Sequence, residues 1–298
     1  MKPLIGITIG DQAGIGLEII EKATAEVQDI CMPLIIGKRV LNPVYGKVNP
    51  EYGMLAGKAI KEAIFMALRN EIEAVVTAPI SKEAFSLGGW KYPGHTEMFA
   101  DLTNTKDYAM MLIHKNFRVI HATTHIPLRK VFDVLTEDRI LETIKVAYET
   151  CRKLGIDEPK IAVAGINPHS SDGGLFGDEE KTIIQPAIDK AREYGFKVIE
   201  YPIPADVVFA KALGGAYDCV VAMYHDQGHI PLKTVGFEWG QDGWEKVDGV
   251  NLTCGLPIIR TSPDHGVAFG KAGKGTADPT SMINAIKVAV TLIKNRWK

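Results

Sequence analysis

Short apolar runs alternate with amphipathic helical patterns along nearly the whole chain. Runs at residues 3–8, 74–77 and 160–164 each lead into a polar or glycine-rich turn and then into a segment with helical periodicity, and the run at 219–222 leads into a polar stretch at 223–233. Parallel strands need a crossover connection, which is usually a helix, and strands covered on both faces are continuously apolar. The pattern therefore predicts an α/β fold with a mostly parallel sheet flanked by helices.

Some segments are assigned from less regular patterns. Residues 107–114 and 118–123 are strand-like runs a few residues apart, which predicts a strand pair or hairpin. Residues 197–201 favour a further strand and residues 279–296 a last helix. Residues 234–249 are polar and contain tryptophan and glycine, which predicts a loop.

The composition excludes several classes of protein. The net charge is −2 and no basic cluster stands out, so no nucleic-acid partner is expected. No apolar run approaches the ~20 residues of a membrane helix, and the apolar start is too short for a signal peptide. The four cysteines are widely spaced, as in the reduced core of a cytoplasmic protein.

Three predicted strands are each followed by a histidine, at His125, His169 and His225. The carboxyl ends of strands in an open α/β sheet are where ligands bind. A lone histidine in such a loop is more often a hydrogen-bonding residue, but three in equivalent positions favour a shared site. We predict that these imidazoles bind one divalent metal ion. His114 and His121 lie within apolar runs, where a core or surface role is expected.

Three neutral imidazoles leave a divalent ion its full charge and an open position for substrate. That arrangement is typical of a catalytic metal site. All-imidazole ligation favours zinc or another first-row ion, with magnesium, manganese and cobalt as alternatives. Asp226 and Gln227 follow His225 and either orient the ligands or cap the turn.

A second group of residues is suited to a small dianion such as a phosphate ester. Arginine offers a bidentate fork and lysine a point charge. The alternative, ordinary solvated charge, fits Lys233 better than Arg260, because Arg260 ends an apolar run and needs a partner there. The group consists of His95, Thr96, Lys233, Asn251 and Arg260.

A glycine-rich turn, Gly10–Glu18, connects the first predicted strand to the first helix. Such a turn directs free backbone N–H groups toward a ligand above it. The spacing is not the dinucleotide fingerprint of a Rossmann unit and no P-loop lysine follows. A tight strand–helix turn without a ligand is the alternative.

Eight short segments in order closely resemble the 4-hydroxythreonine-4-phosphate dehydrogenase (PdxA-like) family, and together they span nearly the whole chain. They are Gly-Asp-Gln-Ala-Gly-Ile-Gly (10–16), Gly-His-Thr-Glu (94–97), Thr-Thr-His-Ile-Pro-Leu-Arg (123–129), Asn-Pro-His (167–169), Pro-Ala-Asp (204–206), Met-Tyr-His-Asp-Gln-Gly (223–228), Gly-Val-Asn-Leu-Thr-Cys-Gly-Leu-Pro-Ile-Ile-Arg-Thr-Ser (249–262) and Asp-His-Gly (264–266).

The resemblance implies a fold similar to isocitrate and isopropylmalate dehydrogenases, with two α/β lobes around a cleft and no Rossmann domain. Lobe 1 would be roughly residues 1–100 with 250–298, and lobe 2 roughly residues 101–249. It implies a homodimer whose metal site, with ligands His125, His169 and His225, is shared between two subunits. The positions that match substrate contacts are His95, Thr96, Lys233, Asn251 and Arg260.

The relation to isocitrate and isopropylmalate dehydrogenases also implies that the chain binds NAD or NADP, and it does not distinguish between the two. The matching dinucleotide contacts are Gly14, Gly16, His265, Gly266, Ala268 and Asp278. The implied reaction oxidises the secondary alcohol of a 4-phosphorylated hydroxy acid, of the 4-hydroxy-L-threonine phosphate type, and decarboxylates the β-keto acid, as in pyridoxal phosphate biosynthesis. Lys233 is the candidate base, because a desolvated lysine near a cation loses its proton more readily.

The chain departs from the family pattern at three places. Gln12 replaces an expected proline, residues 31–49 are shorter than usual, and residues 237–248 are longer and more polar. Other branches of the family oxidise 4-phospho-D-threonate or D-erythronate, or unphosphorylated dihydrodiols. Residues 228–233 and 265–269 resemble the threonate/erythronate branch more closely, so this catabolic reaction is the alternative.

Two further alternatives belong to different functional classes. A metal-dependent hydrolase or aldolase would use the same three histidines without a nucleotide. A phosphoester-binding protein without enzymatic activity would use only the cationic group, and its ligand would stabilise the fold after chelation of the metal.

Overall fold

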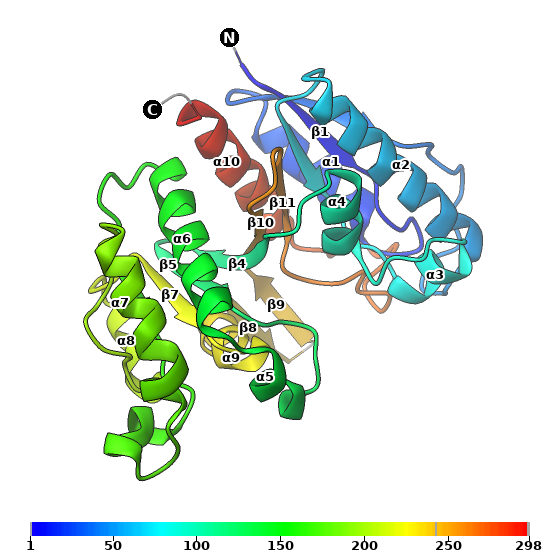
Figure 1. Cartoon of the computed structure of the whole chain (residues 1–298). Coiled ribbons are helices and arrows are strands. Elements are labelled where there is room, and N and C mark those ends of the chain that lie inside the picture. Colours follow the sequence, from blue (N-terminus) through cyan, green and yellow to red (C-terminus); the bar gives the residue numbers. More distant parts are fainter. Residues whose placement is uncertain (1, 242, 297–298) are drawn as a thin grey trace. The chain divides into compact units, whose positions relative to one another are not determined.

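The computed structural model describes residues 2–241 and 243–296, which form two compact units. Unit 1 comprises Met1–Lys106 and Phe237–Lys298, and unit 2 comprises Asp107–Gly236. In Figure 1 the blue and red ends of the chain belong to unit 1 and the green and most of the yellow part to unit 2. Residues 101–106 and 237–249 thus join the first unit, whereas the expected lobes placed them in the second.

The sheet of unit 1 has the strand order β2-β1-β3-β11-β10. β1 is parallel to β2 and β3, β3 is parallel to β11, and β10 is antiparallel to β11. All residues of β3 are buried, as expected for a continuously apolar central strand. The bounds are Leu4–Thr8 (β1), Met32–Ile36 (β2), Ala74–Thr77 (β3), Val250–Cys254 (β10) and Ile259–Pro263 (β11).

The longest helix of unit 1, α2, begins after Asn49, whose side chain accepts a hydrogen bond from the backbone N–H of Glu51. Its apolar face packs into a core with Phe85 and Phe99. The helices are α1 (Gly16–Glu26), α2 (Pro50–Leu68), α3 (Lys82–Leu87), α4 (His95–Leu102) and α10 (Thr280–Lys294), and a two-stranded hairpin contains β8 (Phe237–Gly240) and β9 (Gly243–Val247).

The sheet of unit 2 has the order β4-β5-β7-β6. β4 and β5 form an antiparallel pair, and β5, β7 and β6 are parallel. The bounds are Ala109–His114 (β4), Phe117–His121 (β5), Ile161–Val163 (β6) and Cys219–Ala222 (β7).

The helices of unit 2 pack their apolar faces against this sheet. Val208 and Phe209 of α8 and Leu232 of α9 share a core with Val119 and Val220. The helices are α5 (Leu128–Val134), α6 (Glu137–Lys153), α7 (Gln185–Glu193), α8 (Ala205–Leu213) and α9 (His225–Gly236), with a short turn η1 (Pro168–Gly174) and a π-helical turn η2 (Glu180–Ile184).

The predicted α/β class and the hairpin at 107–123 are confirmed, whereas the strand predicted at 197–201 and the loop predicted at 234–249 are wrong. Residues 197–201 form only an isolated bridge at Val198, because they pair too briefly for a strand. Residues 225–236 form helix α9 although Pro231 lies inside it. Residues 237–247 include the hairpin strands β8 and β9, and residue 242 lies outside the described residues. Among the helices described, none is long and apolar enough to cross a membrane.

Candidate functional site

A pocket of about 270 Å³ lies in unit 2, where β5 and β7 end. His125 and His225 both line it, and their ring centroids are 5.5 Å apart. The other lining residues are Thr124, Ile126, Leu128, Val131, Tyr224 and Asp226. Two of the three predicted metal ligands are therefore brought together within one chain, at the strand ends where the sequence placed them.

The residues that follow His225 fix its position. Nδ1 of His225 lies 2.6 Å from Oδ1 of Asp226, so Nδ1 donates to this carboxylate and Nε2 is the nitrogen left to bind a metal ion. Gln227 accepts a hydrogen bond from the backbone N–H of Met223 and donates one to the carbonyl oxygen of Gly165. A carboxylate behind the distal nitrogen is the usual support of a metal-binding histidine, so His225 fits a metal ion.

Two further histidines lie beside His225: His121, which is buried as one of its expected roles required, and His229, which sequence reasoning missed. The ring of His229 stacks on that of His225 with centroids 3.6 Å apart, and it lies 4.7 Å from the ring of His121. Burial lowers the pKa of His121 to about 4 and that of His229 to about 2. The spacing of His225 and His229, four residues apart, would have indicated a shared helix face had the segment been assigned as helical.

His169 lies apart from these rings in a turn after β6, where its ring meets the edge of Phe176 with centroids 6.2 Å apart. Across residues 2–241 and 243–296 of this single chain, no three His, Cys, Asp or Glu residues are grouped so that they could hold a metal ion. The predicted site includes a second subunit, so the three-histidine ligand set stays a prediction.

In unit 1, Arg260 on β11 is almost completely buried, with 3% of its surface exposed. Its Nη1 donates to Oγ1 of Thr253 at 3.0 Å and its Nη2 to Oγ1 of Thr77 at 2.8 Å. The guanidinium lies over the ring of Phe99, 5.6 Å from the centroid. Burial lowers the pKa of Arg260 to about 10, so the side chain is a cation at neutral pH.

His95 begins helix α4 and is affected electrostatically by Arg260. Burial, and then the charges of Arg260 and Lys82, lower the pKa of His95 well below its ordinary value, so the ring is neutral. Nε2 of His95 and Nε of Arg260 are buried and have no hydrogen-bond partner among the described residues. Two such nitrogens fit an oxygen-rich ligand that would complete their hydrogen bonds.

The other predicted substrate contacts are distributed over both units. Thr96 is the second residue of α4 and is half-buried. Asn251 on β10 is paired with Ser262 of β11. Lys233 lies on α9 of unit 2, one helical turn after His229, and its charge contributes to the lowered pKa of His229.

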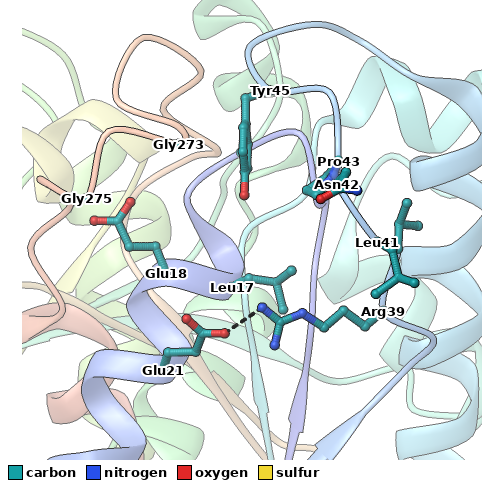
Figure 2. A pocket seen from close by; sticks show the side chains of 12 residues that line it. Leu17, Glu18, Glu21, Arg39, Leu41, Asn42, Pro43, Tyr45, Gly273 and Gly275 are labelled. Carbon is teal, nitrogen blue, oxygen red and sulfur yellow. Dashed lines mark ion pairs between the residues drawn. The ribbon is translucent and has the colours of Figure 1, made fainter.

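The glycine-rich turn of unit 1 borders a larger pocket of about 700 Å³. Figure 2 shows Glu18 and Glu21 of α1 on one side and Tyr45 and Arg39 of the segment after β2 on the other. Arg39 and Glu21 form an ion pair at 2.8 Å. The remaining lining residues are Gly14, Leu17, Val40, Leu41, Asn42, Pro43, Gly273 and Gly275.

The predicted dinucleotide contacts of the turn and of the 265–268 loop meet in unit 1. The backbone N–H of Ile15 donates to the carbonyl oxygen of Val267 at 3.0 Å, and a Cβ atom at Gly14 would lie 2.6 Å from that oxygen. Ala268 adopts a φ of 45°, whereas a Cβ atom at Gly266 would meet open space. Gly16 begins α1, and Nδ1 of His265 lies 2.9 Å from the carbonyl oxygen of Gly266.

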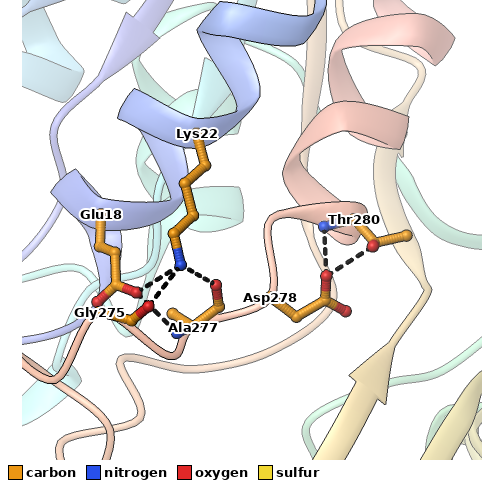
Figure 3. A network of polar contacts seen from close by, with 6 residues as sticks. All are labelled: Glu18, Lys22, Gly275, Ala277, Asp278 and Thr280. Atoms are coloured by element: carbon orange, nitrogen blue, oxygen red, sulfur yellow. Dashed lines mark hydrogen bonds and ion pairs between the residues drawn. The ribbon is translucent and has the colours of Figure 1, made fainter.

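Asp278, the last predicted dinucleotide contact, has protein donors around its carboxylate. Oδ1 accepts hydrogen bonds from the N–H and the hydroxyl of Thr280, as Figure 3 shows, and Oδ2 accepts one from the N–H of Val247. In the same view, Lys22 binds Glu18 and the carbonyl oxygens of Gly275 and Ala277. Helix α1 and the 265–279 loop are therefore fixed to each other next to the pocket.

Comparison with known proteins gives consistent matches over nearly the whole chain. The family model described as pyridoxal phosphate biosynthetic protein PdxA matches residues 10–289. A D-threonate 4-phosphate dehydrogenase of Salmonella typhimurium is 44% identical over 97% of this chain and 98% of its own. A 4-hydroxythreonine-4-phosphate dehydrogenase of Desulfosudis oleivorans is 42% identical over 97% of this chain and 96% of its own.

Solved structures agree with the sequence matches. A 4-hydroxythreonine-4-phosphate dehydrogenase from Klebsiella pneumoniae superposes with a TM-score of 0.82 at 40% identity, over 98% of both chains. Isocitrate dehydrogenase from Methylococcus capsulatus shares the fold, with a TM-score of 0.52 at 14% identity over 97% of this chain and 85% of its own. The predicted relation to the isocitrate dehydrogenase fold is thereby confirmed.

Proposed function

The chain belongs to the PdxA family, and we propose that it is a dehydrogenase that oxidises the secondary alcohol of a 4-phosphorylated hydroxy acid with NAD or NADP. D-threonate 4-phosphate is the preferred candidate substrate, because relatives with that name are 44% identical. 4-Hydroxy-L-threonine phosphate, with decarboxylation of the β-keto acid, is the second candidate, supported by the relative at 42% identity.

The observation that carries the proposal is the buried cation beside an uncharged imidazole in unit 1. Arg260 donates hydrogen bonds to two threonine hydroxyls. Its Nε and the Nε2 of His95 are both buried and have no hydrogen-bond partner within the described part of the chain. A phosphate oxygen would supply the missing acceptor and the compensating charge. Anchoring the phosphate away from the reacting carbon orients the substrate.

The metal part of the proposal is supported by unit 2. His125 and His225 line one pocket, and His225 is oriented by Asp226 with its Nε2 lone pair available. His169 is proposed as the third ligand. A divalent ion bound there, zinc by preference, would lower the pKa of the substrate hydroxyl. Lys233, one turn beyond His229, is proposed to take up the hydroxyl proton.

The nucleotide is proposed to bind in unit 1, along the glycine-rich turn and the 265–268 loop. Support comes from the close approach of Gly14 to Val267 and from the neighbouring pocket of about 700 Å³. The backbone N–H groups of the first turn of α1, which have no acceptor within the helix, suit a pyrophosphate.

A homodimer with the metal site at its interface is proposed from the apolar surface around the predicted ligands. Leu128 and Phe132 of α5 are 63% and 49% exposed next to the pocket of His125, and Leu175 and Phe176 are 72% and 45% exposed after His169. Large exposed apolar side chains mark interaction surfaces. A cytoplasmic location is proposed because all four cysteines are buried and free.

The proposal is tested with D-threonate, D-erythronate and 4-hydroxy-L-threonine 4-phosphates, each with NAD and with NADP, by following absorbance of the reduced cofactor. We expect metal-dependent reduction with at least one acid, and none after chelation. His169→Ala should remove turnover and leave the melting temperature of the apoprotein within a few degrees, since His169 is exposed. Metal-dependent turnover without any nucleotide would instead establish a hydrolase or aldolase.

A further inference from the structure

The turn that carries His169 has a left-handed backbone. Six successive residues have positive φ: His169 (52°), Ser170 (53°), Ser171 (72°), Asp172 (45°), Gly173 (73°) and Gly174 (99°). Only the last two are glycine, and a non-glycine residue normally visits this region singly. Such a run persists only where surrounding contacts enforce it.

A buried carboxylate, that of Glu180, makes most of the side-chain contacts that hold the turn. Glu180 is 4% exposed, and its Oε1 accepts hydrogen bonds from the backbone N–H groups of Ile166 (2.8 Å) and Asn167 (2.7 Å). Its Oε2 accepts from Nδ2 of Asn167 at 2.9 Å and from the hydroxyl of Ser171. Glu180 therefore binds the residues before His169 and the residue two positions after it.

The segment that delivers Glu180 is itself irregular. Glu180 begins the π-helical turn Glu180–Ile184, a rare element that recurs at functional sites. Glu179 adds a second acceptor for Nδ2 of Asn167 at 2.6 Å. Gly177 has a φ of 124°, which favours glycine, and a Cβ atom there would lie 2.6 Å from Oε2 of Glu179 and 2.8 Å from Nδ2 of Asn167, so a side chain would crowd this contact.

We propose that Glu180 is a positioning residue for His169: it holds the left-handed turn of residues 168–174 and so sets the direction in which the imidazole is presented to the metal ion. A right-handed or extended path through Ser170 and Ser171 would break the bonds to Glu180 and turn His169 elsewhere. The inference rests on the proposed function, because it takes His169 as a metal ligand. Beyond the proposed ligands, it assigns a role to Glu180, which does not contact the metal ion and acts on His169 through the backbone of the turn.

The experiment compares wild type with Glu180→Gln. All four groups around the Glu180 carboxylate are donors in the structure, so the carboxamide must turn its NH₂ toward one pair of them and lose at least one hydrogen bond. We expect Zn²⁺ and Co²⁺ to bind about 10- to 100-fold more weakly in titration calorimetry, the loss typical when support behind a metal ligand is removed. Hydrogen exchange of the peptide covering residues 166–174 should accelerate in the apoprotein.

Matched variants separate positioning from general damage. Glu193→Gln removes an exposed carboxylate on α7 and should leave metal affinity and exchange unchanged. Ser171→Ala deletes one bond to Glu180 and should weaken binding by a smaller factor; it serves as the test variant should Glu180→Gln fail to fold.

The outcomes distinguish this inference from the proposed function. Wild-type affinity in Glu180→Gln, together with loss of binding in His169→Ala, would overturn the positioning role and leave the metal site intact. Slower or unchanged exchange at residues 166–174 would equally overturn it. Failure of the wild-type protein to bind either ion, or undiminished binding in His169→Ala, would refute the metal part of the proposed function and this inference with it.

Discussion

Nδ1 of His229 lies 3.2 Å from Nε2 of His121, and the direction of this hydrogen bond is fixed by a carbonyl group behind His121. Nδ1 of His121 lies 3.1 Å from the carbonyl oxygen of Met110, so it carries the proton and Nε2 must accept. Nδ1 of His229 is then the donor, shared with the carbonyl oxygen of His225 at 3.0 Å. Both rings are neutral, and the lone pair of His229 is on Nε2.

The first prediction concerns acid sensitivity of the apoprotein. The pKa values of His121 and His229 are about 4 and about 2 in the folded state, below the ordinary value of 6.5. Unfolding therefore takes up protons below pH 6.5, and stability is lost as pH falls from there toward the folded pKa values. We expect the free energy of unfolding, measured by urea titration, to decrease between pH 7 and pH 5 by up to about 1.4 kcal/mol per pH unit for each ring.

The control for acid sensitivity is His229→Gln, which removes one of the two titrating groups. The variant should be less stable at pH 7, because packing and a hydrogen bond are lost. Its stability should nevertheless fall less steeply with decreasing pH, by roughly one group's share. An unchanged slope would show that His229 is protonated in the folded protein.

The second prediction concerns Arg260. Arg260→Ala should raise the Michaelis constant for a 4-phosphorylated acid by about 10- to 100-fold, the effect of losing a charged hydrogen-bonding partner of a phosphate. The constant for the nucleotide should change little. Steady-state kinetics with the phosphorylated acid and with its unphosphorylated analogue measure the difference.

Arg260→Lys gives the matched comparison, because it keeps the charge but lacks the planar guanidinium whose two nitrogens donate to Thr77 and Thr253. The Michaelis constant of Arg260→Lys for the phosphorylated acid should lie between those of the wild type and Arg260→Ala. An equal effect of Arg260→Ala on both acids would mean that the phosphate does not meet this side chain.

Sequence patterns predicted the architecture because burial dictates them. The continuous apolar runs of β3 and β7 could only be covered strands, and histidine or threonine marked where they end. His125 and His225 were expected together because strand ends of one sheet converge, and they line one pocket. That inference needed only periodicity and topology.

The supporting residues could not be predicted in the same way. His121 ends an apolar strand, so a core position was one of the two roles that the sequence predicted for it. Its partner could not be predicted, because His229 lies 108 positions later on a helix that contains proline. The left-handed path through Ser170 to Asp172 has no glycine signal of its own. It depends on Glu180, a tertiary contact that local propensity does not encode.

The third prediction concerns the glycine-rich turn. Gly14→Ala would place a methyl group 2.6 Å from the carbonyl oxygen of Val267, an atom of the backbone that cannot rotate away. We expect a loss of about 1–3 kcal/mol in stability, typical of overpacking, and weaker nucleotide binding as the turn and the loop separate. Thermal unfolding and equilibrium binding of NAD and NADP test both effects.

Gly270→Ala is the control for Gly14→Ala, since a Cβ atom at Gly270 meets nothing within 4 Å. It should match wild type within about 0.5 kcal/mol in stability, as for a surface substitution. If Gly14→Ala behaved in the same way, the close approach of the turn to Val267 would not exist in solution.

The last prediction tests the left-handed turn directly at Asp172, which is exposed and has a φ of 45°. Asp172→Gly should be as stable as wild type or up to about 1 kcal/mol more stable, because glycine adopts this conformation without steric cost. Asp172→Val should lose about 1–2 kcal/mol, since a β-branched side chain clashes with the backbone at positive φ. At Asp157, which is also exposed but has no positive φ, glycine should instead be the less favourable residue. Chemical denaturation of the wild type and these three variants tests the prediction. Equal stability of the valine and glycine variants at position 172 would mean that the backbone there is right-handed or extended.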